Sequence, residues 1–248
     1  MKVVYILWLR QIKRYLRSRA RMFGSLGQPL MFLIALGYGF GPIFQRANNI
    51  NYISFLVPGI IAQTILFSAI FTGIEVIWDR QFGFLKETLV APVSRFSIML
   101  GRTLGGATVS TIQGILVLLI SFLLGFTPQH FLTIPIAIIF MFIIALFFTA
   151  LGTAIASLLT DFHGFQIIIN FLIMPLFFLS GALFPLKGLP WLLMVISVLN
   201  PLTYGVDALR SILVNIVHFN LSFDLMILCL LSFTILVIGS YLFNNIEA

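Results

Sequence analysis

Long apolar segments alternate with short polar connections along this chain. Six of the segments are long enough to cross a bilayer core of ~30 Å at 1.5 Å per residue. They are longer than the roughly ten-residue alternating segments of outer-membrane barrels. The pattern therefore predicts an all-α membrane protein with transmembrane helices at residues 23–44, 53–77, 101–124, 132–158, 165–184 and 222–243.

The composition agrees with this pattern. Of 248 residues, 60% are hydrophobic and 8% are charged, whereas about a quarter of the residues of a soluble domain are charged. The net charge of +7 could indicate nucleic-acid binding. The basic residues, however, flank the apolar segments, which favours a topology signal and not a nucleic-acid partner.

Residues 1–22 are predicted to form an amphipathic helix at the membrane surface. At 100° per residue, Val4, Trp8 and Tyr15 fall on one face together with other apolar side chains. The opposite face carries the basic residues Arg10, Lys13, Arg14, Arg17 and Arg21. A plain cationic flank would explain the charge but not its segregation, so we expect an interfacial helix on anionic lipids.

Residues 79–98 form a polar island between the second and third predicted spans. Phe82, Leu85 and Leu89 follow the i, i+3, i+7 spacing of one helical face, and Glu87 falls on the other side. A polar helix between two spans lies in water, where a soluble partner can bind it. We therefore expect a coupling helix that receives force from such a partner.

The segment 185–221 is apolar but is interrupted by proline and glycine into pieces too short to span a bilayer. Broken apolar helices of this kind indicate re-entrant or interfacial structure. Asp207 and Arg210 within it are three residues apart, which predicts a local ion pair. Contact with a transported substrate is the alternative role for these two residues.

The distribution of lysine and arginine predicts the orientation of the chain. Seven of them lie before the first span and four in the stretch 79–102, against three on the other side. Because cytoplasmic loops carry the excess of basic residues, both termini are expected to be cytoplasmic and 185–221 to face outward. The whole chain, 1–248, is then a single transmembrane domain.

Motifs for catalysis are absent from the sequence. It contains no G-x-x-x-x-G-K-[ST] nucleotide loop, no H-E-x-x-H and no G-x-S-x-G. We therefore expect no catalytic residue, no metal site and no cofactor bound by this chain. An ion-coupled secondary transporter or an intramembrane enzyme remains as an alternative, disfavoured because we find no ionisable residue inside the spans beyond Glu75.

Two segments resemble a known family, the transmembrane permease subunits of type-2 ABC exporters. FGFLKETLVAPVSR (Phe82–Arg95) is similar to the cytoplasmic loop of that family, an acidic helix followed by a proline and a basic residue. Phe177–Arg210 is similar to its region from span five through the outer helices. One departure is Gly83-Phe84, where the family often has Gly-Thr.

The resemblance implies a fold, partners and residue roles. The permease would act as a homodimer, each copy docked on a separate nucleotide-binding subunit that holds ATP and Mg. Phe82, Leu85, Glu87, Leu89 and Arg95 would form the contact with the ATPase. An amphipathic or lipid-like compound, a drug or a glycan would leave between the two copies, through the inner membrane of a prokaryote.

Overall fold

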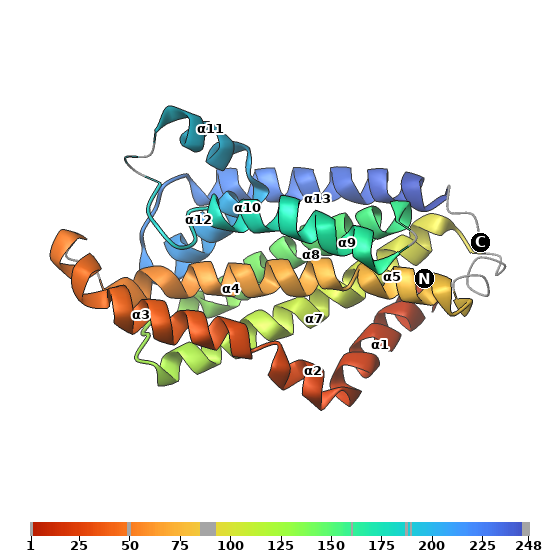
Figure 1. The fold of residues 1–248 in the computed structure, drawn as a ribbon, viewed down its shortest axis with the longest axis horizontal. Helices are drawn as coiled ribbons and strands as arrows, with labels where there is room; N and C mark the ends of the chain where they lie inside the picture. The colour runs from red at the N-terminus through yellow and green to blue at the C-terminus, as the bar shows by residue number, and fades with distance from the viewer. Residues whose placement is uncertain are drawn as a thin grey trace.

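The chain folds into an elongated bundle of helices. The computed structural model describes residues 2–48, 51–84, 93–159, 161–186, 188 and 190–244. Within these ranges the chain contains no β-strand, and the long helices run side by side along one axis (Figure 1). The predicted all-α class is therefore confirmed for the described part of the chain.

The helices follow one another with short connections. In chain order they are α1 (Lys2–Arg17), α2 (Arg19–Gly24), α3 (Gly27–Asn48), α4 (Tyr52–Phe71), α5 (Ile74–Gln81), α7 (Arg95–Leu123), η1 (Phe131–Thr133), α8 (Ile134–Leu158), α9 (Phe162–Ile168), η2 (Ile169–Ile173), α10 (Met174–Phe178), α11 (Trp191–Leu199), α12 (Pro201–Val214) and α13 (Leu221–Asn244).

Among the described residues, five helices are long and apolar enough to cross a membrane, or six if the bent pair α11–α12 counts as one. The five are Met22–Ile43, Tyr52–Gln81, Arg95–Leu123, Phe131–Leu158 and Leu221–Phe243. The fifth predicted span, 165–184, corresponds instead to the shorter apolar helix Phe162–Phe178.

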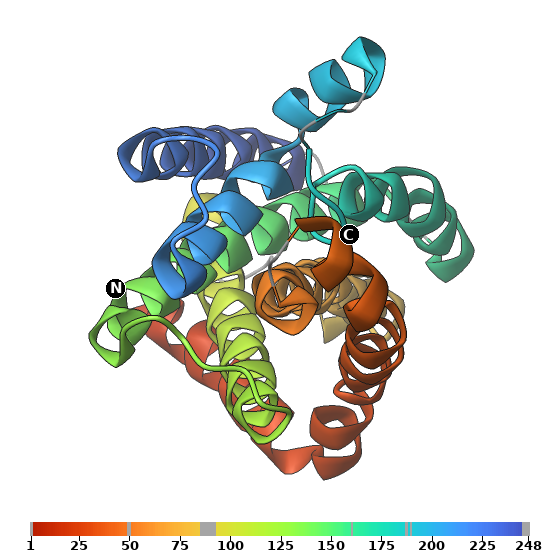
Figure 2. The ribbon, with the colours of Figure 1, turned by 90° about the vertical axis from the view of Figure 1, so that its left-hand side faces the viewer.

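The helix α4 lies at the centre of the bundle, as the view along the long axis shows (Figure 2). It packs against α3, α7, α8 and α12. A Cβ atom at Gly59 would collide with the carbonyl oxygen of Ala182, so the absence of a side chain allows this close approach. A helix that is apolar all round is suited to such a central position.

The second predicted span is divided and longer than expected. Its helix stops at Phe71 and resumes at Ile74, and Gly73 between them lies against the carbonyl oxygen of Gly152. The second piece, α5, ends at Gln81. The extension places Glu75 and Asp79 on a helix that continues to the end of the bundle where α1 begins (Figure 1).

The helix Phe162–Phe178 contains a π-helical turn at residues 169–173, directly before Pro175. Proline has no backbone N–H to donate inside a helix, and a π turn accommodates this local defect. The helix ends six residues before the predicted limit of 184. A helix could not extend to 184 in any case, because Gly181 has a φ of 74°.

The helices α11 and α12 meet at an angle of 85°. The prediction that 185–221 is broken into short helices is confirmed, since α11 has 9 residues and α12 has 14. In both views α11 projects from the bundle (Figures 1 and 2). The start of α12 is instead covered by neighbouring helices, and Leu202 and Val206 are buried.

Candidate functional site

The N-terminal helix α1 packs along the first half of α7. Its residues Leu7 and Tyr15 are buried. A Cβ atom at Gly105 would lie 2.7 Å from the Cβ of Gln11, so this glycine provides the room for α1. Trp8 fixes the contact by donating a 3.0 Å hydrogen bond from Nε1 to Thr108 Oγ1. Small residues let two membrane helices approach closely, and Gly105 has this role here.

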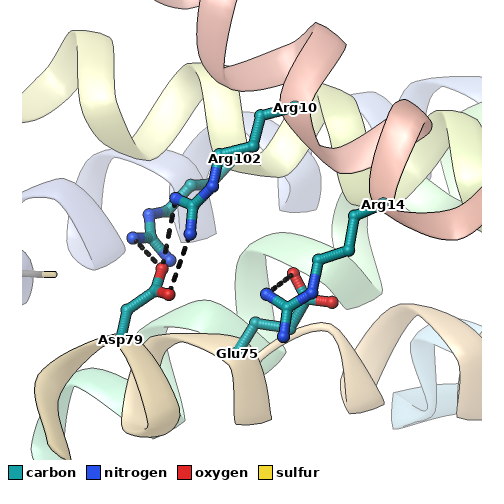
Figure 3. A network of polar contacts seen from close by, with 5 residues as sticks. All are labelled: Arg10, Arg14, Glu75, Asp79 and Arg102. Atoms are coloured by element: carbon teal, nitrogen blue, oxygen red, sulfur yellow. Dashed lines mark hydrogen bonds and ion pairs between the residues drawn. The ribbon is translucent and has the colours of Figure 1, made fainter. Parts of the chain in front are cut away.

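A network of charged side chains joins α1, α5 and α7 (Figure 3). Asp79 of α5 accepts a hydrogen bond of 2.6 Å from Arg102 of α7 and one of 3.0 Å from Arg10 of α1. One helical turn away, Arg14 of α1 lies 3.4 Å from Glu75 of α5. Three helices that are distant in sequence are therefore held together by ion pairs.

The spacing of the charged residues explains the geometry of the network. Arg10 and Arg14 are four residues apart, as are Glu75 and Asp79, so each pair lies on one face of its helix. Since Arg10 meets Asp79 and Arg14 meets Glu75, α1 and α5 run antiparallel. The guanidinium of Arg10 also stacks on the ring of Phe84, 3.8 Å from its centroid.

Burial differs across the network. Arg102 is 3% exposed and Asp79 is 7% exposed. The side chains of Arg10 and Arg14 are about one-third exposed, at 34% and 33%. Removing one partner of a buried ion pair is strongly destabilising, whereas exposed pairs contribute little. The pair Asp79–Arg102 is thus the fixed part of the network, and Arg14–Glu75 is its more accessible part.

The five basic residues of the predicted interfacial helix do not share one environment. Lys13 and Arg17 are exposed on α1, while the side chain of Arg21 is outside the described part. Arg10 and Arg14, which we expected at the membrane surface, bind the protein's own acidic residues. For the exposed residues Lys13 and Arg17, contact with lipid stays a prediction.

The predicted contact with an ATPase lies partly outside the described residues. Leu85, Glu87 and Leu89 belong to the undescribed segment 85–92. Phe82, directly after α5, is 84% exposed, and Arg95 is the first residue of α7. The described ends of this loop thus lie next to the charge network, since α5 carries Asp79 and α7 carries Arg102.

Sequence reasoning missed Glu75, Asp79 and Arg102 as members of a network. The matched four-residue spacings of two acids and two arginines were the available signal. The structure also corrects the expectation that the spans hold no ionisable residue beyond Glu75. Arg102 lies in the predicted span 101–124 and Asp224 in 222–243, and both are buried.

The predicted ion pair at the outer helix is corrected as well. Asp207 accepts hydrogen bonds from the backbone N–H groups of His218 and Phe219. Arg210 donates to the carbonyl oxygen of Gly181 at 3.0 Å and stacks on the ring of Phe55. Both residues are described, and no hydrogen bond or direct ion pair joins them, since each side chain is bonded to backbone groups of other segments.

Side-chain hydrogen bonds hold the bend between α11 and α12. Asn200 caps α12 by accepting from the N–H of Leu202, and it donates to the carbonyl oxygen of Leu176 at 2.6 Å. Thr203 and Tyr204 each donate to a carbonyl oxygen near the end of α11. These bonds satisfy backbone groups that the bend would otherwise leave unpaired.

The network consists of ion pairs and hydrogen bonds between charged side chains. Within the described residues, no group of three or more His, Cys, Asp or Glu side chains could hold a metal ion. Ion pairs can form and separate as helices move, without any covalent step. The arrangement is therefore suited to joining the movements of α1, α5 and α7.

Comparison with known proteins agrees with the resemblance seen in the sequence. Residues 2–214 match the family described as "ABC-2 type transporter". The putative transport permease ycf38 of Cyanophora paradoxa is 33% identical over 214 residues, which cover 84% of this chain and 72% of the relative.

Two relatives from other organisms are similar over comparable lengths. Nodulation protein J of Rhizobium leguminosarum bv. viciae is 28% identical over 213 residues, 85% of this chain and 82% of the relative. Nodulation protein J of Rhizobium meliloti (strain 1021) is 28% identical over 206 residues, 82% and 78% of the two chains. The chain therefore belongs to the ABC-2 type transporter family and is a type-2 ABC permease.

Proposed function

We propose that this permease is the membrane-spanning subunit of an ATP-driven exporter that is powered by a separate ATPase chain. Family membership supports association with an ATPase subunit. The sequence carries no nucleotide-binding loop of its own, so ATP and Mg belong to that partner. Two copies of this chain form the transport unit, and each is docked on one ATPase subunit.

The charge network carries this proposal. Asp79 and Arg102 lie at the two ends of the loop that is predicted to meet the ATPase, and they are bonded to each other. Arg10 binds Asp79 and Arg14 binds Glu75, so α1 is connected to α5 at two positions. A displacement of the loop would move α5, α7 and α1 together, which is the behaviour required of an energy input.

The topology follows from the helix arrangement and the charge distribution. The five long helices and Phe162–Phe178 cross the membrane, and α11–α12 form an outer re-entrant pair that closes the pathway. In Figure 1, α1 begins and α13 ends at the same end of the bundle as α5. This end is cytoplasmic because it carries the excess of basic residues, and the membrane is the inner membrane of a prokaryote.

The exported compound is amphipathic or lipid-like, a class that includes drugs and glycolipids. The proposed route runs between the two copies of the permease. Large apolar side chains on α3, such as Met31 and Ile43, are exposed at 67% and 66%. An apolar surface of this kind suits lipid, a second copy or an apolar cargo, and it supports a dimer within the membrane.

The experiment combines the permease with candidate ATPase subunits in nanodiscs and measures complex assembly and ATP turnover. Glu87→Arg reverses the charge on the proposed contact helix and is expected to abolish assembly. Glu247→Arg makes the same change near the C-terminus and is expected to have no effect. Assembly and turnover that are unchanged by Glu87→Arg would contradict the proposed contact.

A further inference from the structure

A cavity of about 330 Å³ lies between α1, α3, α4, α5 and α7. This volume is at the lower end of the range for small-molecule sites. Its lining extends from Gln63 in the middle of α4 to Trp78 on α5. At 1.5 Å per residue these positions are roughly 20 Å apart, so the cavity runs from the centre of the bundle toward the charge network.

The walls of the cavity combine apolar surface with several polar side chains. Four helices each contribute a glutamine, namely Gln11, Gln28, Gln63 and Gln113. Gln63 and Gln113 are 2% and 4% exposed. Gln113 donates a 2.9 Å hydrogen bond to Ser25, which also lines the cavity. Amide groups both donate and accept hydrogen bonds, so they suit a ligand that does the same.

Oε1 of Gln63, on a side chain that is 2% exposed, is a buried polar atom of the lining with no hydrogen-bond partner among the described residues. Most buried polar groups in proteins are paired, because an unpaired one is unfavourable. The hydroxyl of Tyr15, also 2% exposed, lines the same cavity and lies beside the side chain of Gln113. A polar ligand in the cavity could satisfy Gln63 and reach the Tyr15 hydroxyl.

The Tyr15 hydroxyl is a neutral donor and acceptor at physiological pH. Burial raises its pKa above the ordinary value, and the nearby Gln113 side chain lowers it by a smaller amount. The ring of Tyr15 and the indole of Trp78 supply aromatic surface to the same walls. Such surfaces pack well against the apolar face of a saturated ring.

The lining has almost no net charge. Its one charged residue is Glu75, and all of the lining residues are in the described part of the chain. Arg14 lies 3.4 Å from the Glu75 carboxylate and compensates its charge. A phosphate or carboxylate would therefore find no free cation here, and its desolvation would be uncompensated. The walls favour an uncharged ligand.

We propose that this cavity binds the uncharged, hydroxyl-rich headgroup of an amphipathic molecule, with a sugar ring as the type of headgroup that fits. The inference rests on the proposed export function and names its substrate class. Hydroxyl groups would pair with Gln63, Gln113 and Tyr15, while the ring packs on Trp78. The site lies within one permease chain, at the entry side of the route between two copies.

Trp78 provides a direct probe of occupancy. The chain has 3 tryptophans, and Trp8 is kept because its hydrogen bond fixes α1, so Trp191→Phe leaves Trp8 and Trp78. The Trp191→Phe chain, in phosphatidylcholine nanodiscs, is titrated with a short-chain monoglucosyl diacylglycerol or with phosphatidylglycerol of the same acyl chains. The emission change that is lost when Trp78→Phe is added is assigned to Trp78. We expect a saturable change in Trp78 emission with the glucosyl lipid alone.

Gln63→Met keeps the length of the side chain and removes its hydrogen bonds. It should weaken glucosyl-lipid binding about tenfold, the loss expected for one hydrogen bond of ~1.4 kcal/mol. Gln166→Met, on α9 and outside the lining, should bind normally. Should Gln63→Met fail to fold, Gln28→Met at the exposed edge of the cavity replaces it with the same expectation.

The inference is overturned by any of three results. These are no saturable response to the glucosyl lipid, an equal or stronger response to phosphatidylglycerol, and unchanged affinity in the glutamine variant. Because the measurement contains no ATPase, these results would leave the proposed coupling to an ATPase intact. Loss of ATPase assembly with preserved lipid binding would contradict the proposed function and leave the cavity assignment intact.

Discussion

Arg102 donates a 2.6 Å hydrogen bond to Asp79, and both side chains are almost completely buried. The pair joins the end of the second span to the start of the third, on either side of the loop that we propose to meet an ATPase. Arg10 reaches the same carboxylate from the N-terminal helix. The loop is thus connected at its base to three helices, and the following expectations test that connection.

Asp79→Asn should lower the free energy of unfolding by about 3–5 kcal/mol, because Arg102 would be left as an uncompensated buried charge. Denaturant unfolding of the purified permease in detergent measures the effect. Asp161→Asn is the matched control. Asp161 is exposed and caps α9 by accepting from Gly164 N–H, and asparagine caps as well as aspartate, so we expect a change of at most about 0.5 kcal/mol.

The double variant Asp79→Asn with Arg102→Gln removes both buried charges. It should recover more than half of the stability lost in Asp79→Asn, because the main cost is the unpaired charge and not the lost contact. A double variant that is as unstable as the sum of the two single variants would show that the two residues act independently.

Gly105→Ala and Gly39→Ala should change stability in opposite directions. A Cβ at Gly105 would meet Gln11 at 2.7 Å and push α1 away from α7, at a cost of about 1–3 kcal/mol. Nothing lies within 4 Å of a Cβ at Gly39, where alanine should add about 0.5–1 kcal/mol through helix propensity. Thermal unfolding of both variants tests the packing of α1, and equal effects would contradict it.

Asp207 and Arg210 should show only weak coupling in a double-mutant cycle. Each has its own hydrogen-bond partners and the two charges attract only through space, so the coupling between Asp207→Asn and Arg210→Gln should stay below about 1 kcal/mol. Stability of the two single variants and the double variant in detergent gives the coupling energy. A coupling energy above about 1 kcal/mol would show that the two residues form the ion pair that their spacing predicts.

Asp224 is fully buried near the start of α13, and neither of its carboxylate oxygens has a hydrogen-bond partner. An ionised carboxylate in such surroundings is costly. Asp224→Asn should therefore leave stability unchanged or raise it by about 1 kcal/mol at neutral pH. A strongly destabilised variant would show that the carboxylate is required. Ser232→Ala, at another unpartnered buried oxygen of α13, is the control.

The sequence was sufficient to predict the helical class and the broken outer helices. Apolar periodicity and proline and glycine positions are local signals, and they act on each element separately. A small residue such as Gly105 permits a close approach but does not show which group approaches, so its partner, Gln11 of α1, was not predictable.

The pairing of charges was not predictable in the same way. Arg10 and Arg14 on an amphipathic helix have the same pattern whether they face lipid phosphate or protein carboxylates. The choice depends on where α5 lies, and α5 exists as a separate helix because the second span breaks at Gly73. Asp207 and Arg210 were misjudged for a related reason, since backbone partners from distant segments outcompete a neighbour at i+3.

The central claim is that the contact between α1 and α5 transmits the movement of the ATPase to the permease. Charge exchange at Arg14 and Glu75, the accessible pair, tests it most directly. The measurement is ATP turnover by the assembled complex with Arg14→Glu, Glu75→Arg and the two changes together.

The account predicts that each single variant assembles but loses most of the turnover that depends on the permease. The exchanged pair should restore at least half of it, because opposite charges again face each other across α1 and α5. Single variants with normal turnover, or an exchanged pair as inactive as the single variants, would contradict the account.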